Sequence, residues 1–112
     1  MSILETDKID IVGTRPGTNV VRLVVADHLG WDDVERHSKL LQEKINTYIA
    51  FVESGQLGNL QEPTIPPSPD VVIALALTAV PSDEAKVFLA ETERFLRGIG
   101  LGFVVEVHPP SE

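Results

Sequence analysis

The 112-residue sequence contains no cysteine. Without cysteine a chain has no disulfide framework, no thiolate nucleophile and no cysteine-ligated zinc or iron–sulfur site. Basic residues are also scarce: nine Lys and Arg stand against 17 Asp and Glu, which leaves a net charge of −8. Nucleic-acid binding requires a basic surface that displaces phosphate counterions, so we expect no nucleic-acid partner.

Long apolar runs are missing as well. The longest, residues 71–80, reaches about half the length of a membrane-spanning helix. Residues 1–10 alternate apolar and charged types and lack the basic and apolar regions of a signal peptide. We therefore expect a cytoplasmic protein with no membrane partner. A length of 112 residues and a hydrophobic content of 43% are typical of one globular domain.

The first half of the chain predicts two strands and a helix. Residues 8–13 and 19–27 are rich in β-branched side chains, and Pro16 and Gly17 between them favour a tight turn, so we expect a hairpin. Asp32 is expected to cap the following helix, with Glu35 completing a capping box. A helix is expected here because its apolar residues fall on one stripe: Val34, Leu41, Ile45, Tyr48, Ile49 and Val52. Gly55 should end this helix, since glycine is common just after the last helical turn.

The second half predicts a strand, a helix and a strand. Residues 70–80 form a continuous apolar run, Ser82 is placed to cap a helix that ends near Gly98, and residues 101–108 form the last strand. A strand–helix–strand unit implies parallel neighbours joined by a right-handed crossover. The predicted fold is therefore an α+β two-layer sandwich in the order ββαβαβ, with a four-stranded mixed sheet and both helices on one face.

Residues 54–69 connect the two halves and contain four prolines, at 63, 66, 67 and 69. A connection of this length in a small domain is functional, mobile or a stiff extended spacer. Residues 63–66 also match the PxxP pattern that aromatic grooves bind.

Alternation along the predicted strands assigns the bulky residues, including Ile11, to the face beneath the helices. The other face receives Asp10, Glu106 and many small apolar residues. Two helices cannot cover both faces, and an exposed apolar patch of this size marks an interaction site. We expect a homodimer or a protein partner at this face, unless the connection or the N-terminal segment covers it. The predicted interface residues are Val12, Val20, Arg22, Val24, Ala26, Val72, Ala74, Ala76 and Val104.

Polar residues gather where the second strand ends and the first helix begins. His28, Asp33 and His37 could bind a divalent metal, because imidazole and carboxylate groups are common metal ligands. His28 could instead act as a general base oriented by Asp27 or Asp32. Each residue also has a structural interpretation, as a helix cap or a half-buried histidine, and no further catalytic motif accompanies the cluster.

Residues 21–33 read VRLVVADHLGWDD, and residues 40–55 read LLQEKINTYIAFVESG. This pattern resembles a family of small uncharacterised bacterial proteins. The resemblance implies a bacterial cytosolic protein and supplies no activity.

From the residues we favour a non-catalytic interaction protein that requires no cofactor, self-associates and has a role similar to that of an inhibitor or immunity protein. The alternative is a metal-binding or acid–base hydrolytic protein with its site between Asp27 and His37.

Overall fold

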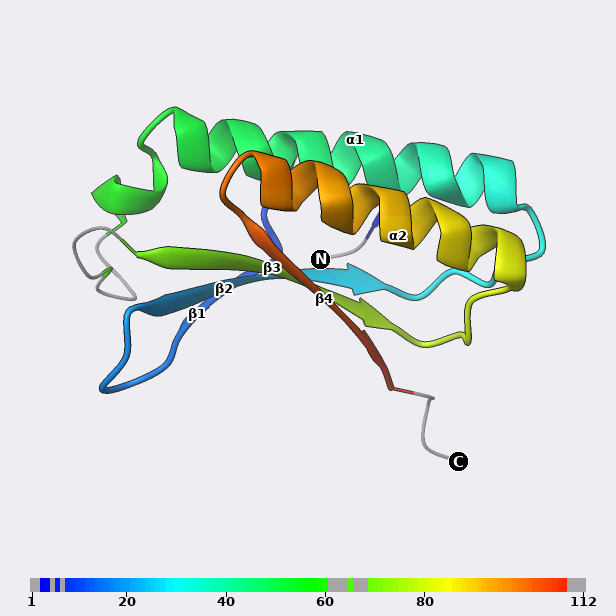
Figure 1. Cartoon of the computed structure of the whole chain (residues 1–112), viewed down its shortest axis with the longest axis horizontal. Coiled ribbons are helices and arrows are strands. Elements are labelled where there is room, and N and C mark those ends of the chain that lie inside the picture. The colour runs from blue at the N-terminus through cyan, green and yellow to red at the C-terminus, as the bar shows by residue number, and fades with distance from the viewer. Residues whose placement is uncertain (1–2, 5, 7, 61–64, 66–68, 109–112) are drawn as a thin grey trace.

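The structure, a computed structural model, describes residues 3, 4, 6, 8–60, 65 and 69–108. It consists of two layers, a four-stranded sheet and a pair of helices that both lie on one side of it (Figure 1). The predicted order ββαβαβ is confirmed. The elements are β1 (Ile11–Thr14), β2 (Val20–Asp27), α1 (Val34–Glu53), the short 3-10 helix η1 (Leu57–Asn59), β3 (Asp70–Leu77), α2 (Asp83–Gly98) and β4 (Gly102–Val107).

The strands lie side by side in chain order, with β1 antiparallel to β2 and the other pairs parallel. The hairpin between β1 and β2 forms as predicted. The amide of Thr18 donates to the carbonyl of Arg15 at 3.1 Å, and Gly17 has a φ of +78°, a value that favours glycine. The two parallel connections run through α1 and α2, which places both helices over the same face.

The first turn of α1 differs from the prediction by one residue. Asp33, not Asp32, is the N-cap, and its carboxylate accepts from the amide of Arg36 at 3.0 Å. The expected capping box does not form, because Glu35 then lies two residues after the cap instead of three. The helix ends at Glu53 with Ser54 as its C-cap, and Gly55 with a φ of +83° provides the predicted stop. In α2, Ser82 caps as predicted and accepts from the amide of Ala85 at 3.2 Å.

The core lies between the sheet and the helices. Inward-facing strand residues alternate with outward-facing ones along β2, and the apolar side chains of α1 and α2 pack over them. Fully buried members of this core include Val21, Leu23, Val25, Ile73, Leu75, Leu77, Leu41, Tyr48 and Leu96.

The side chains of β1 face the opposite way from the prediction. Val12 pairs with Leu23 and packs against the core, so it lies beneath the helices and not on the other face. Ile11 pairs with Val24, which places it on the face away from the helices. The hairpin turn sets the register of the pair, and a shift of one residue moves every side chain to the other face.

The connection after α1 contains η1, whose Leu57 is buried, and Ile65 packs against the core. Of the predicted PxxP pattern, residues 63, 64 and 66 lie outside the described residues. Within the described ranges, no helix is both long and apolar enough to cross a membrane.

Candidate functional site

We call the side of the sheet away from the helices the open face. One row of paired residues runs across its middle, from Ile11 on β1 through Val24 and Ala74 to Val104 on β4. Apart from Val12, every residue predicted for the interface lies on this face. Its members are Ile11, Val20, Arg22, Val24, Ala26, Val72, Ala74, Ala76, Val104 and Glu106.

The two ends of the central row are the most exposed parts of the open face. Ile11 is 43% exposed and Val104 is 42% exposed, which is high for bulky aliphatic side chains. Ala74 lies between them and is completely buried. It is therefore enclosed by its neighbours and is not itself available to a partner.

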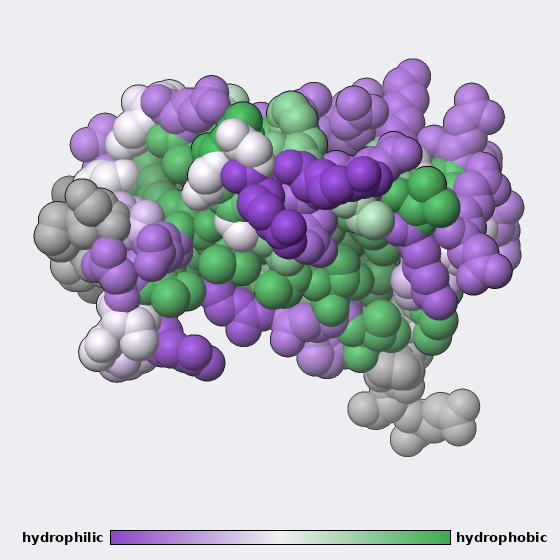
Figure 2. Space-filling view, viewed as in Figure 1, coloured by the Kyte–Doolittle hydropathy of each residue, from purple (hydrophilic) through white to green (hydrophobic). Residues whose placement is uncertain are grey.

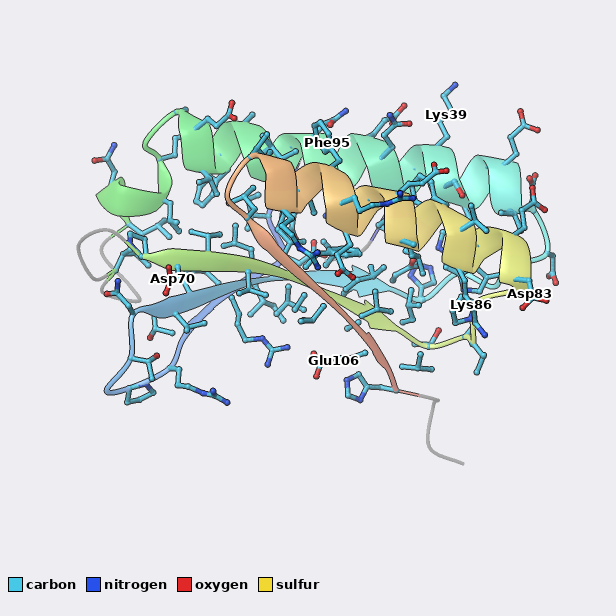
Figure 3. The ribbon with its side chains drawn as sticks, viewed as in Figure 1. Lys39, Asp70, Asp83, Lys86, Phe95 and Glu106 are labelled. Atoms are coloured by element: carbon cyan, nitrogen blue, oxygen red, sulfur yellow. The ribbon has the colours of Figure 1, made fainter. Side chains whose placement is uncertain are left out.

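An ion pair crosses the open face. The guanidinium of Arg22 on β2 contacts the carboxylate of Glu106 on β4, and β3 lies between these two strands. Figure 3 shows Glu106 on the side of the sheet opposite to the helices. Both side chains are partly solvated, so the pair adds at most about 1 kcal/mol of stability. Apart from this neutralised ion pair, the members of the open face named above carry aliphatic side chains.

The described part of the N-terminal segment lies in the helix layer. Ile3 is buried in the core, and the hydroxyl of Thr47 on α1 donates to the carbonyl of Thr6 at 2.5 Å. This segment therefore packs beside α1 and, over the described residues, leaves the open face uncovered.

The junction of β2 and α1 holds a buried pair. Asp27 and His37 are each 2% exposed, and His37 Nε2 lies 2.5 Å from Asp27 Oδ2. The other ring nitrogen, Nδ1, lies 2.9 Å from the carbonyl oxygen of Gly30. Trp31 stacks on the imidazole with ring centroids 3.6 Å apart, and its indole N–H donates to the carbonyl of Ala79 at 3.3 Å.

These contacts define what His37 can do. A carbonyl oxygen only accepts, so Nδ1 donates to Gly30, while Nε2 and the Asp27 carboxylate are hydrogen-bonded to each other. Both nitrogens are occupied, and neither is free to ligate a metal or to accept a proton from a substrate. The pair instead ties the end of β2 to the first turns of α1.

The structure does not bring the three predicted metal ligands together. His37 points into the protein, Asp33 caps α1, and His28 is exposed. Asp27 does not orient His28, because its carboxylate contacts His37 and accepts from the amide of Leu29. Over the described part of the chain, no group of three or more His, Cys, Asp or Glu residues could hold a metal ion.

His28 instead borders a shallow hollow that it shares with Thr78 and His108. The hollow lies where β2, β3 and β4 end, and the carboxyl ends of parallel strands meet at one edge of a sheet. The sequence analysis placed His108 at the end of the last strand and did not connect it with His28. Because His28 and His108 each follow one of the parallel strands, the parallel order could have predicted that these two histidines lie at the same edge of the sheet.

A second buried polar cluster escaped the sequence analysis completely. Lys44 Nζ donates to Asp10 Oδ1 at 2.7 Å, and both side chains are fully buried. The hydroxyl of Tyr48 accepts from the amide of Asp10 and donates to the carbonyl of Val24 at 2.6 Å. Burial raises the pKa of the Tyr48 phenol well above its ordinary value of 10, so the hydroxyl remains a donor.

The cluster corrects the predicted position of Asp10, which lies beneath the helices and not on the open face. Asp10 Oδ2 also accepts a hydrogen bond from the amide of Ala26 at 2.9 Å. Asp10 itself lies one residue before the start of β1. The carboxylate therefore substitutes for a ladder hydrogen bond and holds the chain before β1 against β2.

A family model matches residues 1–109, which include all the helices and strands of the described residues. The chain belongs to DUF6572, a family of unknown function. Membership confirms the predicted relation to an uncharacterised family. No curated protein and no solved structure matches this DUF6572 chain.

Proposed function

We propose that this DUF6572 protein is a non-catalytic interaction domain that binds a second protein through its open face. The simplest partner is a second copy of the chain. One observation carries the proposal: both helices cover one side of the sheet, while the other side presents aliphatic side chains, with Ile11 and Val104 each more than 40% exposed. A sheet face that is meant for water is normally polar.

The energetics favour contact over solvation. Burial of apolar surface contributes about 25 cal/mol per Å², so a patch of several hundred Å² provides on the order of 10 kcal/mol before association costs. Those costs are of similar size, and the net affinity is therefore modest. The Arg22–Glu106 pair remains satisfied within one protomer and leaves no unpaired charge at such a contact.

The buried polar groups support a non-catalytic role. The Asp27–His37 pair and the Asp10–Lys44–Tyr48 cluster use their polar atoms for bonds inside the protein. With a net charge of −8, the chain is steered toward basic surfaces, as expected for an inhibitor or immunity-like protein.

A substitution of Ile11→Lys tests the proposal, because it places a charge on the open face far from β4. The matched control is Val87→Lys, since Val87 is 59% exposed on α2 and distant from the sheet face. Sedimentation velocity over a range of concentrations should show wild-type species larger than 12.2 kDa. We expect Ile11→Lys to weaken this association at least tenfold and Val87→Lys to leave it unchanged.

Two results would contradict the proposal. If wild-type protein and Ile11→Lys associate equally, the open face is not the contact surface. If the wild type remains a 12.2 kDa monomer at millimolar concentration, the chain does not bind itself through this face.

A further inference from the structure

One edge of the sheet is a longer and more apolar strand than the other. β4 has six residues against four in β1, and three of its valines are unusually exposed: Val104 at 42%, Val105 at 39% and Val107 at 37%. Figure 2 shows apolar side chains gathered along the sheet below the polar surface of α2. Edge strands are usually protected by Lys, Pro or a bulge. β4 contains only one charge, Glu106, and its carboxylate is paired with Arg22.

The direction of the peptide groups along β4 follows from one hydrogen bond. The amide of His108 donates to the carbonyl of Leu77 on β3 at 2.7 Å. In a strand, the N–H and C=O of one residue point to the same side, and the side alternates from residue to residue. Residues 102, 104 and 106 therefore bond to β3, while Phe103, Val105 and Val107 direct their peptide groups away from the sheet.

We propose that a second copy of the chain pairs with this edge, β4 against β4, in antiparallel orientation about a two-fold axis at Val105. In this register Val105 exchanges both peptide hydrogen bonds with Val105 of the second copy, and Phe103 does so with Val107. Every outward peptide group of the strand then has a partner. A two-fold axis at residue 103 or 107 would leave some of them unpaired.

The side chains are complementary in the same register. On the helix side, Val105 lies opposite Val105 and Phe103 lies opposite Val107, so the exposed aliphatic groups cover each other. On the open face, Val104 lies opposite Glu106, whose charge Arg22 already neutralises. No two like charges meet along the strand.

The flank of α2 above this edge carries charges of both signs. Phe88 and Phe95 line a groove against α1, so the opposite flank of α2 borders β4. Helical spacing places Glu93 and Arg97 on the same flank as Lys86, and Glu93 pairs with Arg97 at 2.5 Å. The two-fold axis places both α2 helices on the same side of the joined sheet, in antiparallel orientation. The flank that borders β4 carries two basic groups and one acidic group, so the negative charge of the whole chain, −8, is not concentrated at this edge.

This contact uses the edge of the sheet and not its face, although Val104 and Glu106 belong to both surfaces, and it goes beyond the proposed function. Edge pairing extends the sheet sideways, whereas the open face would bind a second layer. Each copy can therefore use both contacts, and paired sheets would then stack face to face.

Cross-linking tests the register directly, because the chain has no cysteine of its own. In the proposed pair the two Cα atoms of residue 105 lie about 5.5 Å apart, within reach of a disulfide. We expect Val105→Cys to form a covalent dimer on mild oxidation. The control is Val87→Cys, which reports random collision from a more exposed site. Both cysteine variants are also tested in combination with Ile11→Lys, which prevents association through the open face.

A second pair of variants tests the association without cross-linking. Val105→Lys places two like charges in contact at the two-fold axis, whereas Val104→Lys places each lysine opposite Glu106. In the Ile11→Lys background we expect Val105→Lys to reduce dimerisation at least tenfold and Val104→Lys to retain it, by sedimentation velocity.

The inference is overturned if Val105→Cys cross-links no faster than Val87→Cys, or if Val105→Lys and Val104→Lys associate equally. Either result leaves the open-face proposal intact, because that proposal depends on Ile11→Lys against Val87→Lys. Capture of an added valine-rich peptide by the β4 edge in place of a second copy would also contradict the pairing proposed here.

Discussion

At the scale of single residues, the most consequential feature is a lysine in the core. Lys44 is fully buried on α1 and neutralised by Asp10, while Tyr48 satisfies backbone groups of Asp10 and Val24. Among the described residues, no buried side-chain polar atom lacks a hydrogen-bond partner. Loss of one member of such a buried ion pair typically costs about 3–5 kcal/mol, because the other charge remains buried. That cost measures the charge left without its partner and not the net contribution of the pair, so both members of the pair are required together.

The phenol of Tyr48 predicts how stability responds to alkali. Its pKa is raised in the folded protein, chiefly by burial, whereas in the unfolded chain it ionises near 10. Above pH 10 the unfolded state therefore binds fewer protons than the folded state, and stability falls as pH rises. The limiting slope for one such group is about 1.4 kcal/mol per pH unit.

A comparison with Tyr48→Phe isolates this contribution. The variant should be less stable than wild type at pH 7 by about 1–3 kcal/mol, since it leaves a carbonyl and an amide without their partner. Its stability should then decline less steeply between pH 10 and pH 12. Urea titrations at several pH values measure both effects, and parallel declines for the two proteins would show that Tyr48 does not titrate differently on folding.

This cluster was beyond sequence-based prediction, and the reason is physical. A lysine or an aspartate is buried only when its partner is present, and Asp10 and Lys44 are 34 positions apart in the chain. Local periodicity places Lys44 beside the apolar stripe of α1 but gives no information about a carboxylate that arrives from another segment.

At the scale of helices and strands, the start of α1 gives two adjacent aspartates different roles. The structure makes Asp33 the cap, whereas the sequence pattern favoured Asp32. We expect Asp33→Ala to lower the free energy of unfolding by about 1 kcal/mol, because it removes the acceptor of the Arg36 amide. Asp32→Ala is the matched control and should change it by less than about 0.5 kcal/mol. Chemical denaturation measures both, and equal losses would argue against Asp33 as the sole cap.

Elements that depend on local patterns were predictable. The two helices, the Ser82 cap, the Gly55 stop and the hairpin all follow from residues that lie within a few positions of each other. The face to which each side chain of β1 points was not predictable, because alternation in a short strand fits either face of the sheet. Only the pairing of Val12 with Leu23 decides it.

The candidate site shows the same division. The residues of the open face on β2, β3 and β4 were predicted from alternation along longer strands. The metal hypothesis required His28 and His37 to converge, but His37 is buried against Asp27 whereas His28 is exposed beside His108. Neighbouring positions in sequence therefore did not imply neighbouring imidazoles.

At the scale of the whole molecule, an acidic chain with exposed aliphatic surface should associate more readily as salt increases. Two copies that each carry −8 repel one another, and raising the ionic strength from about 0.01 M to about 0.1 M shortens the Debye length from about 30 Å to about 10 Å. We expect the dissociation constant for self-association to fall severalfold over this range. Weaker association at higher salt, measured by sedimentation, would instead indicate that ion pairs dominate the contact.

The stacking of Trp31 on His37 has a practical consequence. Trp31 is the only tryptophan in the chain, and it lies 9% exposed at the point where β2 is joined to α1. When this junction opens, the indole exchanges a buried, stacked environment for water, and we expect its fluorescence to change as a result. The protein therefore carries its own fluorescent reporter, which lets the opening of this junction be followed in every variant without a dye.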